Sequence, residues 1–462
     1  MSRPLRTNWD TEAARTYHER TKHTVASVRA GGRYLDWENR PHPFKEYVAL
    51  DRVPLPDGRL GRLLRWGAGV IRTRVLPGGD AYHFRTYSSA GALYPVEVYV
   101  ACADADALPA GLYHFDPLEP ALRPLRPGDV RSTLAEAADE DELSDAEAIL
   151  VLTGILWRTA WKYEARGYRH LYWDAGTMLA NLLALAATHG VEARVLTGFV
   201  DDDVNRLVGV DGRAEAALAL LAVGRAAHAE APPRLEPLDL PVAPISRRPR
   251  EYPDADALHA ASKLEDREAV RRYRAGAART SANAEPLSAA MPLEEVIRRR
   301  GSVRDFSRDP VPRVELEHLL AAAMGSIPAD VLPEGETYLI ANAVDDLPPG
   351  AYRFAPSDGL ELLRSGPFRR EAAFLCLEQP LGGLAAATHF VIAELVQALG
   401  AHGNRGYRAA QLEAGIRVGR MYLGAVAFGM AATASTFYDE EVTRFFGVEE
   451  KEAMLALAAG RR

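Results

Sequence analysis

Residues 87–99 read Tyr87-Ser88-Ser89-Ala90-Gly91-Ala92-Leu93-Tyr94-Pro95-Val96-Glu97-Val98-Tyr99. The first part consists of small residues, which let a backbone approach a flat ligand closely and leave hydroxyl and N–H groups free. The last part alternates apolar and polar side chains, a pattern that predicts a strand. The residues alone leave two interpretations open: an ordinary turn before a buried strand, or a ligand-binding loop.

The stretch resembles the S-A-G-A-L-Y-P signature of SagB-type dehydrogenases, the FMN-binding oxidases of nitroreductase fold that convert azolines to azoles in ribosomally made peptides. Further segments are similar to that family, so that the resemblance covers most of the first 225 residues: Tyr17-His18-Glu19-Arg20-Thr21-Lys22-His23, Leu35-Asp36-Trp37-Glu38-Asn39-Arg40-Pro41, Pro43-Phe44-Lys45 and Gly111-Leu112-Tyr113-His114-Phe115-Asp116-Pro117. The resemblance implies an α+β nitroreductase-like fold and FMN bound at an interface between two such units.

Composition narrows the class of protein. The chain has 462 residues, 48% of them hydrophobic, and a net charge of -8, which argues against a nucleic-acid binder. No apolar run is long enough to span a membrane, and Met1–Arg6 lacks a signal-peptide core. Cys102 and Cys376 make no disulfide framework, which favours a cytoplasmic location. The twelve histidines show no metal-ligand spacing, so we expect no metal site.

The second half repeats the first. Gly111 and Gly350 lie 239 residues apart within similar segments, as do Gly167 and Gly406. The same spacing relates the segments that begin at Asp174 and Glu413. Two copies are too few for a solenoid and predict an intramolecular pseudo-dimer. We therefore expect three regions: residues 1–225, a Pro-rich linker at 226–285 with one helix over Asp254–Ala275, and residues 286–462. At the interface between the two halves we expect two long helices, Leu171–His189 and Leu412–Ala427.

The halves have diverged in a complementary way. The second half carries Arg300-Gly301-Ser302-Val303-Arg304, which is similar to the flavin-anchoring R-x-S-x-R of the family, and paired guanidinium donors suit a phosphate. The first half has Phe44, Glu46 and Val48 at the corresponding positions. Conversely, the second half has lost the loop of small residues, because Ile327, Pro328, Asp330 and Glu334 stand where the first half has Ser88, Ser89, Gly91 and Pro95. It has also lost the segment before that loop, roughly residues 71–87. One FMN site is therefore expected, built from Arg300, Ser302 and Arg304 together with Ser88, Ser89 and Gly91. A further phosphate contact is expected from Arg461, near the C-terminus.

The adjacent pair Lys162-Tyr163 matches a Lys-Tyr pair that SagB-type dehydrogenases need for azoline oxidation. That reaction removes a proton from one ring carbon and a hydride from its neighbour. A free tyrosine, with a pKa of about 10, is a poor base at neutral pH, but a neighbouring ammonium favours its phenolate. We therefore expect Tyr163 to be the base and Lys162 its aid. The second half has Ala401-His402 at this position.

Other polar groups nearby have structural interpretations. Arg166, Tyr168 and Arg169 recur in the second half, so we expect them to support helix and interdomain packing. The run Asp201–Asp203 predicts a helix cap.

The resemblance implies an FMN-dependent dehydrogenase that oxidises thiazoline or oxazoline rings, with a precursor peptide and a cyclodehydratase as partners and with further homo-oligomers possible. Two alternatives remain open. One is a nitro- or ene-reductase of the same fold that uses NAD(P)H, and the other is a flavin-free scaffold in a peptide-modifying complex.

Overall fold

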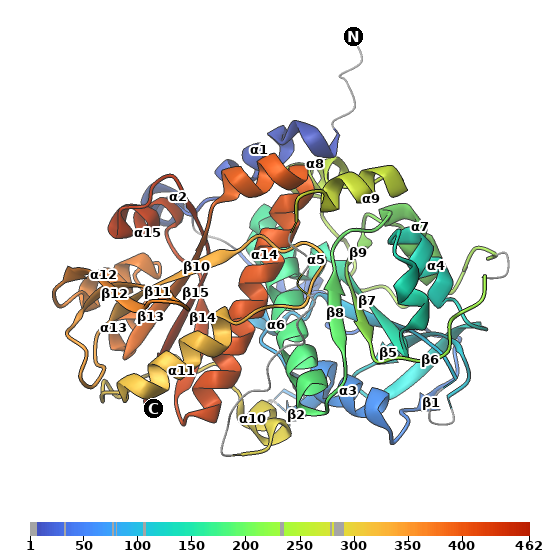
Figure 1. Cartoon of the computed structure of the whole chain (residues 1–462), viewed down its shortest axis with the longest axis horizontal. Helices are drawn as coiled ribbons and strands as arrows, with labels where there is room; N and C mark the ends of the chain where they lie inside the picture. The colour runs from blue at the N-terminus through green and yellow to red at the C-terminus, as the bar shows by residue number, and fades with distance from the viewer. Residues whose placement is uncertain are drawn as a thin grey trace, which may run out of the picture.

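The computed structural model describes residues 7–31, 34–75, 78–79, 81–104, 108–231, 235–277, 280 and 291–462. Two antiparallel sheets, of seven and six strands, lie on opposite sides of two long helices at the centre of the molecule (Figure 1). Their cores merge into one large cluster of buried side chains that draws on both sheets and both helices. The expected α+β fold with two tandem copies is confirmed.

The first half holds the seven-stranded sheet, in the order β1-β6-β5-β4-β7-β9-β8. Its strands are β1 Val53–Pro54, β4 Val96–Cys102, β5 Gly111–Asp116, β6 Ala121–Pro127, β7 Ala148–Ile155, β8 Ala193–Leu196 and β9 Glu215–Val223, with a separate hairpin of β2 Val70–Val75 and β3 Ala81–Arg85. Its helices are α1 Glu12–Arg20, α2 Val25–Ala30, α3 Arg59–Ala68, α4 Arg131–Ala137, α5 Leu156–Tyr163, α6 Gly167–Thr188 and α7 Asp201–Val208.

The second half holds the six-stranded sheet, in the order β12-β11-β10-β13-β15-β14. Its strands are β10 Gly335–Ala341, β11 Gly350–Ala355, β12 Gly359–Ser365, β13 Ala387–Ala393, β14 Ala431–Ser435 and β15 Glu452–Gly460. Its helices are α10 Leu293–Arg299, α11 Arg313–Met324, α12 Arg369–Leu375, α13 Pro380–Leu384, α14 Leu395–Ala427 and α15 Asp439–Phe446.

The two sheets share one topology. Strands β6-β5-β4-β7-β9-β8 follow the same order as β12-β11-β10-β13-β15-β14, and β4, β5 and β7 begin 239 residues before β10, β11 and β13. The hairpin β2–β3 has no equivalent in the described part of the second half, which agrees with the loss expected at residues 71–87.

The central helices α6 and α14 cross at paired glycines. A Cβ added to Gly176 would lie 2.4 Å from the carbonyl oxygen of Leu412, and one added to Gly415 would lie 2.6 Å from that of Trp173. No side chain fits at either position, so glycine permits this close approach of the two helices. Because Gly176 and Gly415 are repeat counterparts, the pseudo-two-fold relation between the halves passes through this crossing.

Each half also supplies a buried carboxylate to two arginines of the other half. The groups are Asp439 with Arg166 and Arg169, and Asp201 with Arg405 and Arg408. The structural role expected for the arginines is confirmed. The run Asp201–Asp203 lies in the first turn of α7, at the helix start that the sequence predicted. The Asp201 carboxylate makes no capping hydrogen bond and contacts the two arginines and the Leu264 N–H.

The described part of the linker contains two helices, α8 Pro253–Ala261 and α9 Arg267–Arg274, where the sequence predicted one. The chain breaks between them because the N–H of Leu264 donates to Asp201, 2.9 Å away. Asp266 then caps α9 by accepting the Ala269 N–H at 2.8 Å. Within the described residues, no helix has the length and apolar character needed to cross a membrane.

Candidate active site

The loop of residues 88–95, called the signature loop below, connects β3 to β4 in a strained conformation. Gly91, Ala92 and Tyr94 have positive φ angles of 63°, 53° and 46°. Two of these residues are not glycine, and such conformations persist only where the surroundings enforce them. The enforcing contacts come from α6, where Thr177 donates to the Ser88 carbonyl oxygen at 2.6 Å and Asp174 accepts two hydrogen bonds.

Asp174 on α6 stabilises the signature loop through two hydrogen bonds. Its carboxylate accepts from the Ser89 hydroxyl at 2.5 Å and from the Ala90 N–H at 3.1 Å. The side chain is fully buried, and burial raises its pKa to about 7 even though these two hydrogen bonds lower it. The sequence marked Asp174 only as the counterpart of Glu413 and gave no sign that it supports the loop.

Lys162 and Tyr163 end α5 and face the signature loop. A Cβ added to Gly91 would lie 3.1 Å from the Tyr163 hydroxyl and 3.3 Å from Lys162 Nζ. The absence of a side chain at Gly91 therefore lets the pair come close to the loop backbone. The Tyr163 ring also stacks on His170, with ring centroids 4.1 Å apart, so its position is fixed from α6.

Arg300 joins the second half to the segment before the signature loop. Its guanidinium is buried and donates to the carbonyl oxygens of Arg85, Thr86 and Tyr87 at 2.9, 3.1 and 3.1 Å. Only Nη1 has no hydrogen bond to a described residue. The sequence assigned Arg300 to flavin binding, and the structure adds a role as a clamp between the halves.

Ser302 and Arg304 follow along the same extended segment. The Ser302 hydroxyl lies 3.1 Å from that of Tyr422, and Ser302 forms a β-bridge with Ala432. Arg304 is exposed and makes no hydrogen bond or ion pair with the described part of the chain. Its charge nevertheless acts on both Lys162 and Tyr163. The structure thus brings together the pieces that the sequence placed on separate halves.

The site gathers positive charge. Burial lowers the pKa of Lys162, and the charges of Arg304 and Arg40 lower it further. Neither Lys162 nor these two arginines pairs with a carboxylate among the described residues. Burial raises the pKa of Tyr163, and the nearby Asp174 adds to the rise while Arg304 opposes it. The sequence placed Arg40 in a segment similar to the family, residues 35–41, but assigned it no role in the site.

Arg461 is held within the second half. Its guanidinium donates to the Gly429 carbonyl oxygen at 2.9 Å and pairs with Glu315 at 2.9 Å. Its charge is therefore balanced locally, and the phosphate contact expected of it stays a prediction.

In the second half, neighbouring segments fill the position that corresponds to Tyr163. His402, the counterpart of Tyr163, bonds through Nδ1 to the Tyr273 carbonyl oxygen at 2.8 Å. The Asn8 side chain donates to the His402 carbonyl oxygen at 3.1 Å and covers the next residue. The arm and the linker therefore occupy the place that stays accessible beside Tyr163.

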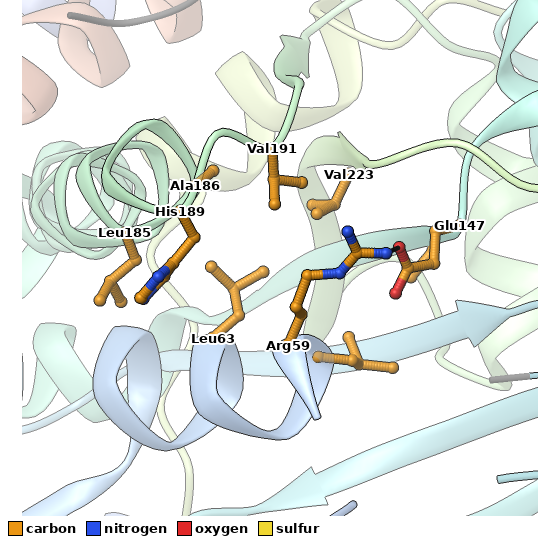
Figure 2. A pocket seen from close by; sticks show the side chains of 10 residues that line it. Arg59, Leu63, Glu147, Leu185, Ala186, His189, Val191 and Val223 are labelled. Carbon is orange, nitrogen blue, oxygen red and sulfur yellow. Dashed lines mark hydrogen bonds and ion pairs between the residues drawn. The ribbon is translucent and has the colours of Figure 1, made fainter. Parts of the chain in front are cut away.

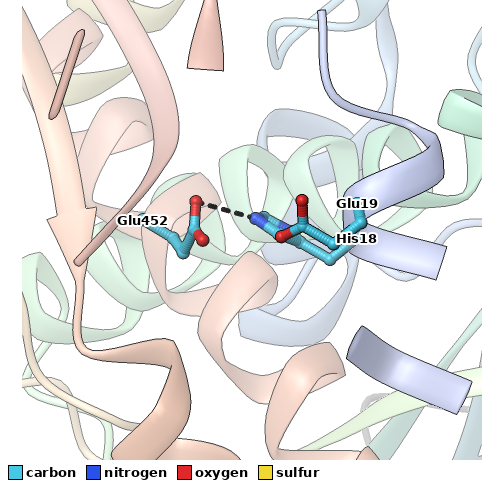
Figure 3. Close-up of side chains that lie close together, drawn as sticks. All are labelled: His18, Glu19 and Glu452. Carbon is cyan, nitrogen blue, oxygen red and sulfur yellow. Dashed lines mark ion pairs between the residues drawn. The ribbon is translucent and has the colours of Figure 1, made fainter. Parts of the chain in front are cut away.

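Two other features lie outside this arrangement. A small apolar cavity of about 20 Å³ lies between α3 and α6, and the Arg59–Glu147 ion pair borders it (Figure 2). It has room for about one water molecule. Elsewhere His18, Glu19 and Glu452 lie close together (Figure 3). The Lys22 ammonium pairs with both carboxylates, at 2.8 and 3.0 Å, so each already has a cationic partner.

The fold and this cross-half site define a class of protein. The chain belongs to the nitroreductase family, whose model matches residues 49–225 and 297–461, once in each half. Nitroreductase-family proteins are oxidoreductases that typically bind FMN.

Known relatives match parts or all of the chain. It is 32% identical over 140 residues to the microcin B17-processing protein McbC of Escherichia coli, a match that covers 29% of this chain and 52% of McbC. The chain thus spans about half the length of that relative. It is 28% identical over 147 residues to a nitroreductase-family protein of Methanocaldococcus jannaschii. That match covers 32% of this chain and 73% of the relative. The crystal structure of an Anabaena variabilis protein assigned as a nitroreductase superposes with a TM-score of 0.81 at 26% identity and covers 97% of this chain and 99% of that one. The tandem arrangement therefore recurs in a solved structure.

Proposed function

We propose that this protein is an FMN-dependent dehydrogenase of the SagB type, which oxidises thiazoline or oxazoline rings in a ribosomally made peptide. The observation that carries the proposal is the adjacent pair Lys162–Tyr163, which faces the signature loop at Gly91 and is missing from the second half. Similarity to a microcin B17-processing protein supports a peptide substrate.

The residues of the site suit FMN. Arg304, Arg40 and Nη1 of Arg300 offer positive charge and donors to a phosphate or to the flavin ring, and Ser302 offers a hydroxyl between two arginines. Signature-loop glycine and serines present a backbone that a flat ring can approach. Bound FMN would supply the acceptor for the hydride that leaves the azoline ring.

The electrostatics favour Lys162 over Tyr163 as the proton acceptor. The pKa of Lys162 is lowered, which increases its neutral amine fraction, whereas the pKa of Tyr163 is raised, which keeps its phenol protonated. We therefore reverse the roles expected from the sequence. Lys162 Nζ takes the proton from one ring carbon while the hydride leaves its neighbour, and the Tyr163 hydroxyl orients the ring by hydrogen bonding.

We further propose that the enzyme acts after a cyclodehydratase on a leader-bearing precursor peptide. An azoline must first be formed by dehydrating cyclisation of a cysteine, serine or threonine side chain onto the preceding amide. The substrate of this chain is therefore the product of that class of reaction.

The test measures the mass loss of two hydrogens per ring on a thiazoline peptide, at matched FMN content. Lys162→Ala should lower turnover by about 10²–10⁴-fold, because a positioned base contributes that much. Tyr163→Phe should lower it less, and His402→Ala, at the filled position of the second half, should leave it unchanged.

Wild-type turnover in Lys162→Ala would contradict the proposal. A larger loss in Tyr163→Phe than in Lys162→Ala would restore the sequence-based assignment of the base. NADH-driven reduction of a nitroarene, with no mass loss from the peptide, would favour the reductase alternative.

A further inference from the structure

Glu164, directly after the catalytic pair, has an unusual backbone conformation. Its φ and ψ are 52° and -142°. Gly403 lies 239 residues later, at the same place in the repeat, and has φ and ψ of 66° and -159°. The two halves therefore keep the same turn, but only the second half has the residue that adopts it without strain.

Glycine at 403 has a steric reason that does not apply at 164. A Cβ added to Gly403 would lie 2.2 Å from the backbone oxygen of Asn8, so no side chain fits there. Glu164 is exposed, and its side chain lines an open cleft. A glycine would relieve the strain at this position at no steric cost. A side chain in so unfavourable a conformation points to a use for that side chain.

The cleft, called the arm cleft below, has a volume of about 410 Å³. The arm lines it with Arg20, Lys22 and His23, the linker with Arg250, and the catalytic turn with Tyr163 and Glu164. Its size lies in the range of ligand sites, and its walls are polar. Tyr163 thus has the signature loop near its hydroxyl and also lines the arm cleft.

We propose that the arm cleft binds the peptide segment that flanks the reacting ring, and that the Glu164 carboxylate accepts hydrogen bonds from amide N–H groups of that segment. This inference rests on the proposed function, since it names how the same site holds its peptide. A carboxylate forms stronger hydrogen bonds to amide N–H groups than a neutral acceptor does. Glu164 is then a specificity-determining residue, and the strained turn presents its carboxylate beside Tyr163.

The experiment measures binding of a fluorescein-labelled thiazoline peptide to the FMN-loaded protein by fluorescence anisotropy, which needs no turnover. Glu164→Ala and Glu164→Gly should each raise Kd about 10-fold or more, the loss expected for a hydrogen bond to a charged group. Glu164→Gln should raise it less, and Glu371→Ala, an exposed glutamate on α12, should leave it unchanged. A second peptide with both N–H groups flanking the ring methylated should bind wild type more weakly and be insensitive to Glu164→Ala.

Thermal unfolding of the same variants tests the strain. Glu164→Gly should unfold at a higher temperature than Glu164→Ala, the reverse of the usual order for these residues.

Wild-type affinity in Glu164→Ala, or equal sensitivity of both peptides to that change, would overturn the inference alone. Binding by wild type without oxidation, together with weak binding by Glu164→Ala, would contradict the proposed function and support the inference. A wild type that binds neither peptide would contradict both.

Discussion

At the scale of single residues, the titration of Asp174, which supports the signature loop, should make the stability of the fold depend on pH. Its pKa is raised to about 7 in the fold, against about 3.9 for a free aspartate. The unfolded chain therefore ionises Asp174 at a lower pH than the folded chain does. The folded state loses stability as the pH rises from about 4 to 7, by up to about 4 kcal/mol.

Asp174→Asn removes this titration, because an amide mimics the protonated carboxyl and can still accept from the Ala90 N–H. The free energy of unfolding of the variant, relative to wild type, should rise between pH 5 and pH 8. Urea unfolding at both pH values measures it. A difference between the two proteins that is the same at both pH values would show that Asp174 does not titrate in this range.

Arg304 and Arg300 should affect FMN in different ways. Arg304→Ala should weaken FMN binding by about 10-fold or more with unchanged stability, since its exposed guanidinium has no partner among the described residues. Arg300→Ala should weaken binding and also lower stability, because it leaves the carbonyl oxygens of Arg85, Thr86 and Tyr87 without this donor.

Fluorescence titration of FMN and thermal unfolding check these expectations. Arg298→Ala removes an exposed charge that is paired with Glu295 and should change neither quantity. Equal FMN affinity in wild type and Arg304→Ala would remove Arg304 from the site.

At the scale of elements, the buried carboxylates connect helix ends across the halves. Burial alone would raise the pKa of Asp439, but Arg166 and Arg169 outweigh it and bring the pKa to about 2. Asp439→Ala would leave two buried guanidinium groups without their carboxylate. It should cost about 3–5 kcal/mol of unfolding free energy at pH 7, and Asp201→Ala should cost a similar amount.

Asp203→Ala, in the same acidic run as Asp201, is the matched control. Asp203 is exposed and pairs with Arg206 within one helix, so its loss should change stability by less than about 0.5 kcal/mol. Equal costs for Asp201→Ala and Asp203→Ala, measured by urea unfolding, would mean that the cross-half pairs do not hold the molecule together.

At the scale of the whole molecule, the duplication could be read from sequence because three similar segments share one spacing. A site shared by both halves could also be predicted, because each half had kept only some of the motifs. The break between α8 and α9 could not be predicted, because it depends on a contact between Leu264 and Asp201, which are distant in sequence. The exchange of roles that we propose for Lys162 and Tyr163 could not be predicted for a similar reason, since burial and the nearness of Arg304 and Arg40 are properties of the folded chain.

We propose that the two halves form one flavin site between them. In one half, Arg300 bonds to the segment just before the signature loop of the other half, and the charge of Arg304 acts on Lys162 and Tyr163. At the corresponding place in the second half, His402 is bonded to Tyr273 and Asn8 covers the next residue. The most direct measurement releases flavin from protein saturated with FMN and freed of excess, and quantifies it against protein concentration. A single site gives about one FMN per chain, and a ratio near two would mean that each half binds a flavin of its own.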